Sequence, residues 1–274
     1  MGLFRKLVRW LLKNKEVKRQ RFNTKFYKLN LLKDPEDKRD EKYALMYPGV
    51  AIPDKCNLVG FPAVKNQGHI GSCASHAFAT CVEYLCSKND KAMDDLPLSE
   101  LFHYYAVRQS GYMGTFPNDS GQYLRDGAKV LKDIGIAPEV TWVYDPAKFN
   151  AQPPNLAYTF ANLWRISAYN RVWSLDSLKF AISQGKPVVF GITVASDCFN
   201  TQSDGELRFN GTISGGHALC ATGYDDNRIN ANGSKGAIQF INSWGRSWGS
   251  YGYGWISYDN FRKNFMDAWT ITVK

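Results

Sequence analysis

The 274-residue sequence has no apolar run that reaches the roughly 18 residues needed to cross a membrane. Arg and Lys interrupt the apolar positions of residues 1–21, so we expect neither a signal peptide nor a transmembrane helix. The six cysteines form no CxxC pair and no zinc-ligand spacing, which argues against a secreted disulfide scaffold and a structural metal site. These absences favour a cytoplasmic protein that needs no metal or other cofactor.

Acidic residues are clearly outnumbered by basic ones in only one part of the chain. Residues 1–47 carry 14 basic and 6 acidic side chains, a net charge of +8, whereas residues 48–274 carry 20 and 19, a net charge of +1. The formal charge of +9 therefore belongs to an N-terminal leader, residues 1–47, rather than to the body, residues 48–274. Because the positive charge is confined to the leader and the aromatic residues are spread through the body, we expect no nucleic-acid partner.

The leader begins with a short amphipathic segment. Residues 3–12 place Phe4, Leu7, Val8 and Leu11 at helical spacing, with basic residues mostly on the rest of the helix. We favour a helix that packs on the body through this apolar stripe, and the alternative is contact with an anionic membrane surface. Residues 13–47 are highly charged and poor in Val, Ile and Gly, which is typical of an arm joined to a separate domain.

The body predicts an α+β protein, because its helical patterns come first and its strand patterns later. With 44% hydrophobic residues, the chain can bury a large core. We expect a helical lobe over about residues 60–165 and a β lobe over about residues 166–274. The predicted helices are 72–85, 98–108, 122–134 and 175–184, and the predicted strands are 188–194, 218–224, 237–243 and 254–258.

Cys73 is the cysteine whose surroundings fit nucleophilic chemistry. It lies in the first turn of the predicted helix 72–85, where free backbone N–H groups and the helix dipole lower a thiol pKa. Gln67, six residues earlier, offers a side-chain amide donor, and Gly68 and Gly71 allow close approach of another backbone. A small buried thiol is the alternative for an isolated cysteine, so Cys73 needs a base and an orienting group from elsewhere.

The chain has four histidines, and His217 is the best candidate for the base. It follows two glycines and opens an apolar strand pattern, which would hold the imidazole rigidly. Asn242 offers an amide oxygen that could accept a hydrogen bond from the ring, and Trp244 could screen that bond from water. His76 is the rival base, although a partly buried helix residue is the simpler interpretation of it.

Three sequence blocks, in this order, resemble the signature of papain-like cysteine peptidases. They are QGHIGSC at 67–73, GGHALCATGYDD at 215–226 and INSWGRSWGSYGYGWISYD at 241–259. Each block is a weak signal alone, but the order Gln, Cys, His, Asn makes the set specific. The resemblance covers about residues 50–274. It implies a papain-like two-lobed fold, with a helical lobe, an antiparallel β-barrel-like lobe and an active-site cleft between them.

The resemblance also implies roles for individual residues. Cys73 would be the nucleophile, His217 the general base and acid, and Asn242 the residue that orients the imidazole. Gln67 and the Cys73 backbone N–H would form the oxyanion hole. The implied substrate-binding residues are Ser120, Gly121, Gly216 and Trp244. The expected activity is hydrolysis of peptide bonds through a thioester, with a peptide or protein as substrate.

The sequence departs from the family pattern in ways that suggest a bacterial or viral branch. Ile70 and Ala74 stand where the family often has a cysteine and an aromatic residue, and no familiar propeptide motif is recognisable in residues 1–47. We favour a zymogen in which residues 14–47 run through or beside the cleft. The alternatives are an amidase or transpeptidase with the same site and a silent peptide-binding module, although the intact set of four residues argues against the last.

Overall fold

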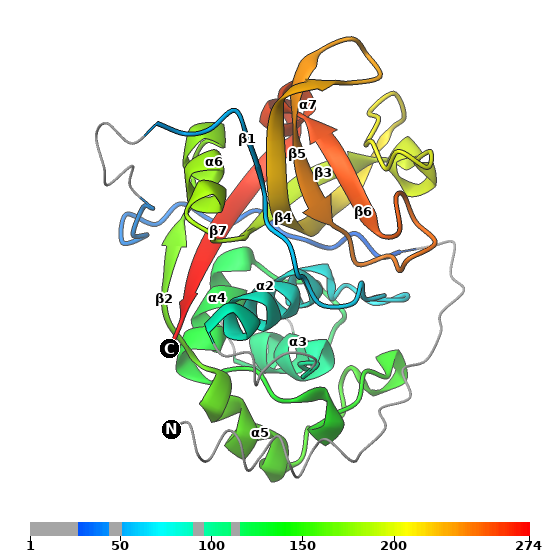
Figure 1. The fold of residues 1–274 in the computed structure, drawn as a ribbon. Coiled ribbons are helices and arrows are strands. Elements are labelled where there is room, and N and C mark those ends of the chain that lie inside the picture. Colours follow the sequence, from blue (N-terminus) through cyan, green and yellow to red (C-terminus); the bar gives the residue numbers. More distant parts are fainter. Residues whose placement is uncertain (1–26, 44–50, 90–95, 111–115) are drawn as a thin grey trace.

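The structure is a computed structural model that describes residues 27–43, 51–89, 96–110 and 116–274 (Figure 1). The amphipathic segment predicted at residues 3–12 lies outside the described residues. In the described part, three helices pack on one side of a large antiparallel sheet, and two shorter helices cover another part of it (Figure 1). The α+β prediction is therefore confirmed.

The helices form where the sequence supplies an apolar face, and some of them also have a serine at the start. Ser99 and Ser174 accept hydrogen bonds from backbone N–H groups in the first turns of α3 and α6, which satisfies donors that a helix leaves free. In α4, Leu124, Ala128 and Leu131 are buried on one face. The helices are α2 (Cys73–Asn89), α3 (Glu100–Gln109), α4 (Leu124–Asp133), α5 (Asn155–Ala161), α6 (Leu175–Ser183) and α7 (Tyr258–Asn264).

The seven strands form one antiparallel sheet in the order β2-β7-β3-β4-β5-β6, and β1 pairs with β4 outside this path. The sheet is open rather than closed into a barrel. Because β4 pairs with β3, β5 and β1, its residues are held from both sides. The strands are β1 (Lys55–Asn57), β2 (Ile166–Arg171), β3 (Val188–Ala195), β4 (Ile213–Ile229), β5 (Lys235–Ile241), β6 (Tyr253–Ser257) and β7 (Phe265–Val273).

Two large apolar clusters hold these layers together. The first joins α2 and α4 to the sheet and contains Phe78 and Leu131 together with Trp269. The second joins the sheet to α6 and α7 and contains Phe190 and Phe261. Burial of these side chains fixes the N-terminal end of α2 against β4, because α2 packs on that strand. The junction of α2 and β4 is where the candidate site lies.

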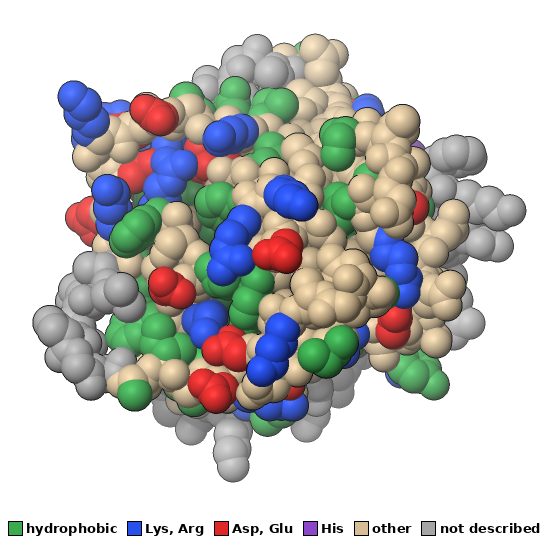
Figure 2. Space-filling view, turned by 90° about the horizontal axis from the view of Figure 1, so that it is seen from above, with side chains coloured by type: hydrophobic (Ala, Val, Ile, Leu, Met, Phe, Trp, Pro, Cys, Tyr) green, Lys and Arg blue, Asp and Glu red, His purple; other side chains and the backbone are tan. Residues whose placement is uncertain are grey.

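The predicted elements correspond to α2, α3, α4 and α6 and to β3, β4, β5 and β6, whereas β1, β2, β7, α5 and α7 were not predicted. No helix among the described residues is long and apolar enough to span a bilayer. On the face seen in Figure 2, Lys and Arg side chains lie interspersed with Asp and Glu. This mixed surface fits the small net charge of residues 48–274.

Candidate active site

Cys73 is the first residue of α2, at the end of the helix that faces β4. Backbone N–H groups of Ala218, Ala74 and Cys73 itself stabilise its thiolate, as a helix N-terminus should. Burial outweighs them, because the residue is 1% exposed, and the pKa of the thiol is raised to about 11. The sequence prediction of a lowered pKa for the Cys73 thiol is therefore wrong for this structure, in which the thiol is buried.

His217 lies in β4 directly before Ala218, whose N–H contacts the Cys73 sulfur. Its Nε2 is 2.8 Å from Asn242 Oδ1, which also accepts the backbone N–H of Ser243 at 2.7 Å. An oxygen that accepts from a backbone N–H is correctly assigned as the amide oxygen, so Nε2 must carry the ring proton. His217 Nδ1 is then an acceptor, and it is buried without a hydrogen-bond partner.

Burial also sets the protonation of His217. Desolvation lowers the pKa of the imidazole to about 4, although the hydrogen bond to Asn242 works in the opposite direction. At neutral pH, this closed site therefore holds a neutral imidazole and a neutral thiol. A thiolate–imidazolium pair would require a more polar environment than the closed site provides.

Trp244 covers the imidazole. The two rings stack with centroids 4.6 Å apart, and Phe199 stacks on Trp244 at 5.1 Å. Tyr27 of the leader also stacks on the indole, at 5.0 Å, and its hydroxyl donates to the Trp244 carbonyl oxygen. This aromatic group shields the hydrogen bond between His217 and Asn242 from solvent.

Gln67 lies beside the same hydrogen-bond network. Its Oε1 accepts from the Ser243 hydroxyl at 2.7 Å, which directs Nε2 toward the carbonyl oxygens of Ile70 and Lys28, at 3.0 and 3.3 Å. Ser243 thus fixes the orientation of both Gln67 and Asn242. Sequence reasoning missed this role, although Ser243 directly follows Asn242 in the third block.

Two of the other histidines, His76 and His103, have structural partners. His76 Nδ1 is 3.0 Å from the Ser72 carbonyl oxygen and its ring packs edge-on against Tyr144. His103 bridges Ser75 and the Gly127 carbonyl oxygen, and burial lowers the pKa of its ring to about 4. His76 therefore behaves as a buried helix residue.

Leader residues 27–32 cross the molecule between the helices and the sheet (Figure 1), where Asn30 is bridged to Gly216 and Leu32 to Tyr123. The Leu31 N–H donates to the Gly216 carbonyl oxygen at 3.1 Å, and the Leu32 N–H donates to the Gln122 carbonyl oxygen at 3.2 Å. Leu31 is 4% exposed and packs in the same apolar cluster as Cys73. The leader is therefore bound to both the helical side and the sheet side of the molecule next to Cys73.

Both of the predicted substrate-binding glycines, Gly121 and Gly216, are in close contact with the leader. A Cβ atom at Gly121 would overlap the carbonyl oxygen of Asn30, and one at Gly216 would overlap that of Leu31. Only glycine leaves this room for another backbone. Ser120 is half-buried beside Gly121, with its hydroxyl 3.5 Å from the Gly121 carbonyl oxygen. The structure thus brings Gly121, Gly216 and Trp244 to one bound segment.

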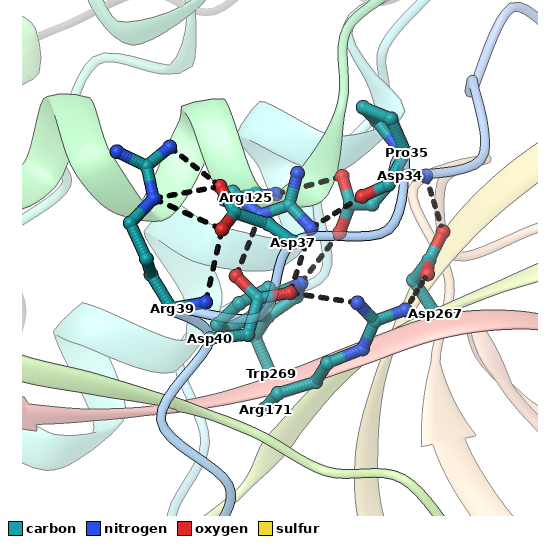
Figure 3. A network of polar contacts seen from close by, with 9 residues as sticks. All are labelled: Asp34, Pro35, Asp37, Arg39, Asp40, Arg125, Arg171, Asp267 and Trp269. Carbon is teal, nitrogen blue, oxygen red and sulfur yellow. Dashed lines mark hydrogen bonds and ion pairs between the residues drawn. The ribbon is translucent and has the colours of Figure 1, made fainter.

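A second part of the leader binds the body through the ion-pair cluster, which we define as Asp34, Asp40, Arg125, Arg171 and Asp267 (Figure 3). Asp40 accepts from Arg125 at 2.7 and 2.8 Å and from Arg171 at 2.7 Å. Asp34 accepts from the Arg125 backbone N–H, and its own N–H donates to Asp267. Arg171 also donates to Asp267 at 2.8 Å. The leader therefore contributes two carboxylates to a half-buried network on α4, β2 and β7.

The similar proteins include viral and bacterial peptidases. An uncharacterized peptidase C1-like protein of Acanthamoeba polyphaga mimivirus is 32% identical over 206 residues, which make up 69% of this chain and 62% of that protein. The crystal structure of xylellain, a cysteine protease from Xylella fastidiosa, matches 94% of this chain and 100% of its own, with 30% identity and a TM-score of 0.77. Digestive procathepsin L 3 of Tenebrio molitor shares the fold, with 22% identity, a TM-score of 0.66 and coverage of 85% and 73%.

Three curated relatives are matched over 52% to 62% of their own length, so the chain spans a little more than half of each. The similarity nevertheless extends over most of the chain described here. The model of the papain family cysteine proteases matches residues 54–268, which include Gln67, Cys73, His217 and Asn242. With these sequence blocks brought together at one site, the chain belongs to the papain family.

Proposed function

We propose that the protein is a cysteine endopeptidase whose nucleophile is Cys73. The observation that carries this proposal is the hydrogen bond from His217 Nε2 to Asn242 Oδ1, because it leaves Nδ1 as a buried acceptor on the residue directly before Ala218, whose backbone N–H contacts the Cys73 sulfur. The peptidase domain would comprise residues 48–274, with the helical lobe at about 60–165 and the β lobe at about 166–274.

The proposed reaction has two stages. His217 Nδ1 takes the thiol proton, and the Cys73 sulfur attacks the carbonyl carbon of the substrate. The oxyanion accepts hydrogen bonds from Gln67 Nε2 and the Cys73 backbone N–H, and the imidazolium then gives its proton to the leaving amine. In the second stage, His217 takes a proton from water, which attacks the thioester carbonyl. The acid product leaves and the thiol is restored.

The leader would act as an inhibitory pro-segment. Its residues 27–32 contact Gln67, Gly216 and Trp244, so a substrate and the docked leader compete for the same groups. The docked leader also excludes water, which keeps the thiol and the imidazole neutral. Release of the leader would therefore open the cleft and favour the reactive thiolate. The peptide-binding groups Ser120, Gly121, Gly216 and Trp244 would then be available to substrate.

The experiment compares the full-length chain with the same chain carrying Leu31→Asn, which weakens leader docking without changing the site. Both are treated with an epoxide thiol trap and with a reporter peptide. We expect more labelling of Cys73 and faster cleavage in the variant. Adding Cys73→Ala or His217→Ala should lower kcat by about 10⁴-fold or more. Adding Gln67→Ala should cost about 10²–10³-fold and Asn242→Ala less.

Two results would contradict the proposal. Turnover by the Cys73→Ala variant near the rate of its parent would exclude Cys73 as the nucleophile. Efficient labelling of Cys73 without turnover of any peptide would instead favour a silent binding module. Circular dichroism and the thermal midpoint of each variant show whether the fold is intact.

A further inference from the structure

Lys28 of the leader contacts two parts of the candidate site at once. Its carbonyl oxygen lies 3.3 Å from Gln67 Nε2, the proposed oxyanion donor. Its side-chain Nζ lies 2.8 Å from Asp119 Oδ2. A single basic residue therefore spans the distance from the oxyanion donor to the Asp119 carboxylate.

The Asp119 carboxylate is held in place by the body rather than by the leader. Its Oδ1 accepts the Gly71 backbone N–H at 3.0 Å and the Tyr104 hydroxyl at 2.5 Å. Because both bonds are made to Oδ1, Oδ2 is available to the Lys28 ammonium group. The Asp119 side chain is 11% exposed. A carboxylate oriented by fixed donors loses little conformational entropy when a cation binds to its other oxygen.

Arg108 of the body interacts electrostatically with Asp119, but its two terminal nitrogens form their hydrogen bonds elsewhere. They contact the carbonyl oxygens of Asn118 and Phe149 and the side chain of Asn150. The Asp119–Lys28 ion pair therefore links the body to a residue that would leave with the leader. When it leaves, a half-buried carboxylate loses its bound cation, which is unfavourable.

We propose that Asp119 is a specificity-determining residue that selects peptide substrates with Lys or Arg at the residue whose carbonyl group is attacked. The inference rests on the proposed peptidase function. The attacked carbonyl oxygen must reach Gln67 Nε2, where the Lys28 oxygen lies. A basic side chain on the same substrate residue then reaches Asp119 Oδ2, as that of Lys28 does.

The negative charge of Asp119 also affects the Cys73 thiol, and this would favour a basic substrate in a second way. Burial is the main cause of the raised pKa of Cys73, and the negative charge of Asp119 raises it further. A substrate cation bound to Asp119 would offset that charge and ease formation of the thiolate. A neutral substrate of the same shape would lack both the ion pair and this assistance.

The experiment uses two reporter peptides that differ only in arginine or citrulline before the scissile bond, since citrulline has nearly the same shape and no charge. The enzyme is the full-length chain with Leu31→Asn, alone or with Asp119→Asn. Asp259→Asn is the matched control, because it removes one negative charge at an exposed position of α7. Both peptides encounter the same open fraction of enzyme, so the ratio of their kcat/KM values does not depend on leader docking.

We expect the arginine peptide to be preferred about tenfold with Asp119 present, as for one charge-assisted hydrogen bond. The ratio should approach one with Asp119→Asn and stay near tenfold with Asp259→Asn. Equal ratios in the Asp119→Asn and Asp259→Asn variants would overturn the inference and leave the peptidase activity standing. If the trap labels Cys73 but neither peptide is cleaved, the proposed function itself fails, and the inference fails with it.

Discussion

The two described halves of the leader are held by different forces. Residues 27–32 contact the site through backbone hydrogen bonds, close approach to glycines and one buried leucine, Leu31. Residues 34–40 contact the body mainly through the ion-pair cluster (Figure 3). The comparison suggests that covering the site and holding the leader on the body are separable tasks. Each can therefore be weakened by itself.

Leu31→Asn should have the largest effect, because it acts on the half that covers the site. The substitution removes about 2 kcal/mol of apolar burial and leaves an amide with unsatisfied hydrogen bonds in an apolar pocket. We expect the rate of Cys73 labelling by the epoxide trap to rise about 10²–10³-fold. A rise of less than threefold would mean that Leu31 does not hold the leader over the site.

Asp40→Asn should have the next largest effect, through the half that holds the leader. It removes a charge that faces two arginines, Arg125 and Arg171, in a site where Asp40 is 8% exposed. Loss of these charge-assisted bonds should raise labelling of Cys73 about thirtyfold. Asp37→Asn is the control, because Asp37 pairs with the exposed Arg39 within the leader itself. Equal effects of the two substitutions would contradict a role for the cluster.

A change of pH should also alter the binding of residues 34–40, the half of the leader that the ion-pair cluster holds. Asp267 faces Asp34 and Arg171, with Lys33 also near, and burial followed by the Asp34 charge raises the pKa of its carboxyl to about 7. Burial raises the pKa of Asp34 as well. Docking therefore takes up protons in the window between the ordinary aspartate pKa of about 4 and about 7, so it weakens as the pH rises through that window and levels off above it.

The expected change is about a tenfold increase in the open fraction between pH 5 and pH 7.5. The measurement is the labelling rate of the parent chain divided by that of the Leu31→Asn variant at each pH, which cancels the ionisation of the thiol itself. A ratio that falls as the pH rises would show that other groups control docking.

Tyr27→Ala should have the smallest effect of the four. It removes the stacking of Tyr27 on Trp244, which is worth about 0.5–1.5 kcal/mol. We expect labelling to increase about threefold. Tyr27→Phe keeps the ring and removes the hydroxyl, which contacts the Trp244 carbonyl oxygen and the Asn66 side chain, so it should change labelling less. A larger effect of Tyr27→Phe than of Tyr27→Ala would exclude stacking as the cause.

The fold could be predicted where local patterns are strong. The start of α2 at Cys73 and the apolar runs of β3 and β5 follow from residue spacing within one segment. By contrast, β2 and β7 pair with each other across about 100 residues of sequence, and β2 carries no clear alternation. Their pairing depends on contacts that exist only in the folded chain.

The candidate site was also predictable only where its residues lie in local sequence patterns. Cys73, His217, Asn242 and Gln67 lie in recognisable blocks, so their meeting could be expected from the family resemblance. The part played by Ser243 depends on which way its hydroxyl points, and that direction is set by the fold. The path of residues 27–43 had no local signal, because the partners of this segment are distant in sequence. Arg125 and Arg171 are examples.

The close approach of the leader to Gly121 and Gly216 has a consequence for how such leaders can vary. At these two points the body meets carbonyl oxygens of the leader, which every amino acid provides. Many side chains could therefore replace Asn30 without loss of this fit, as long as the backbone follows the same course. A leader of this kind need not share a sequence motif with others that block the same cleft. The feature that such leaders would share is instead a pair of glycines on the domain, at the points where the leader backbone makes contact.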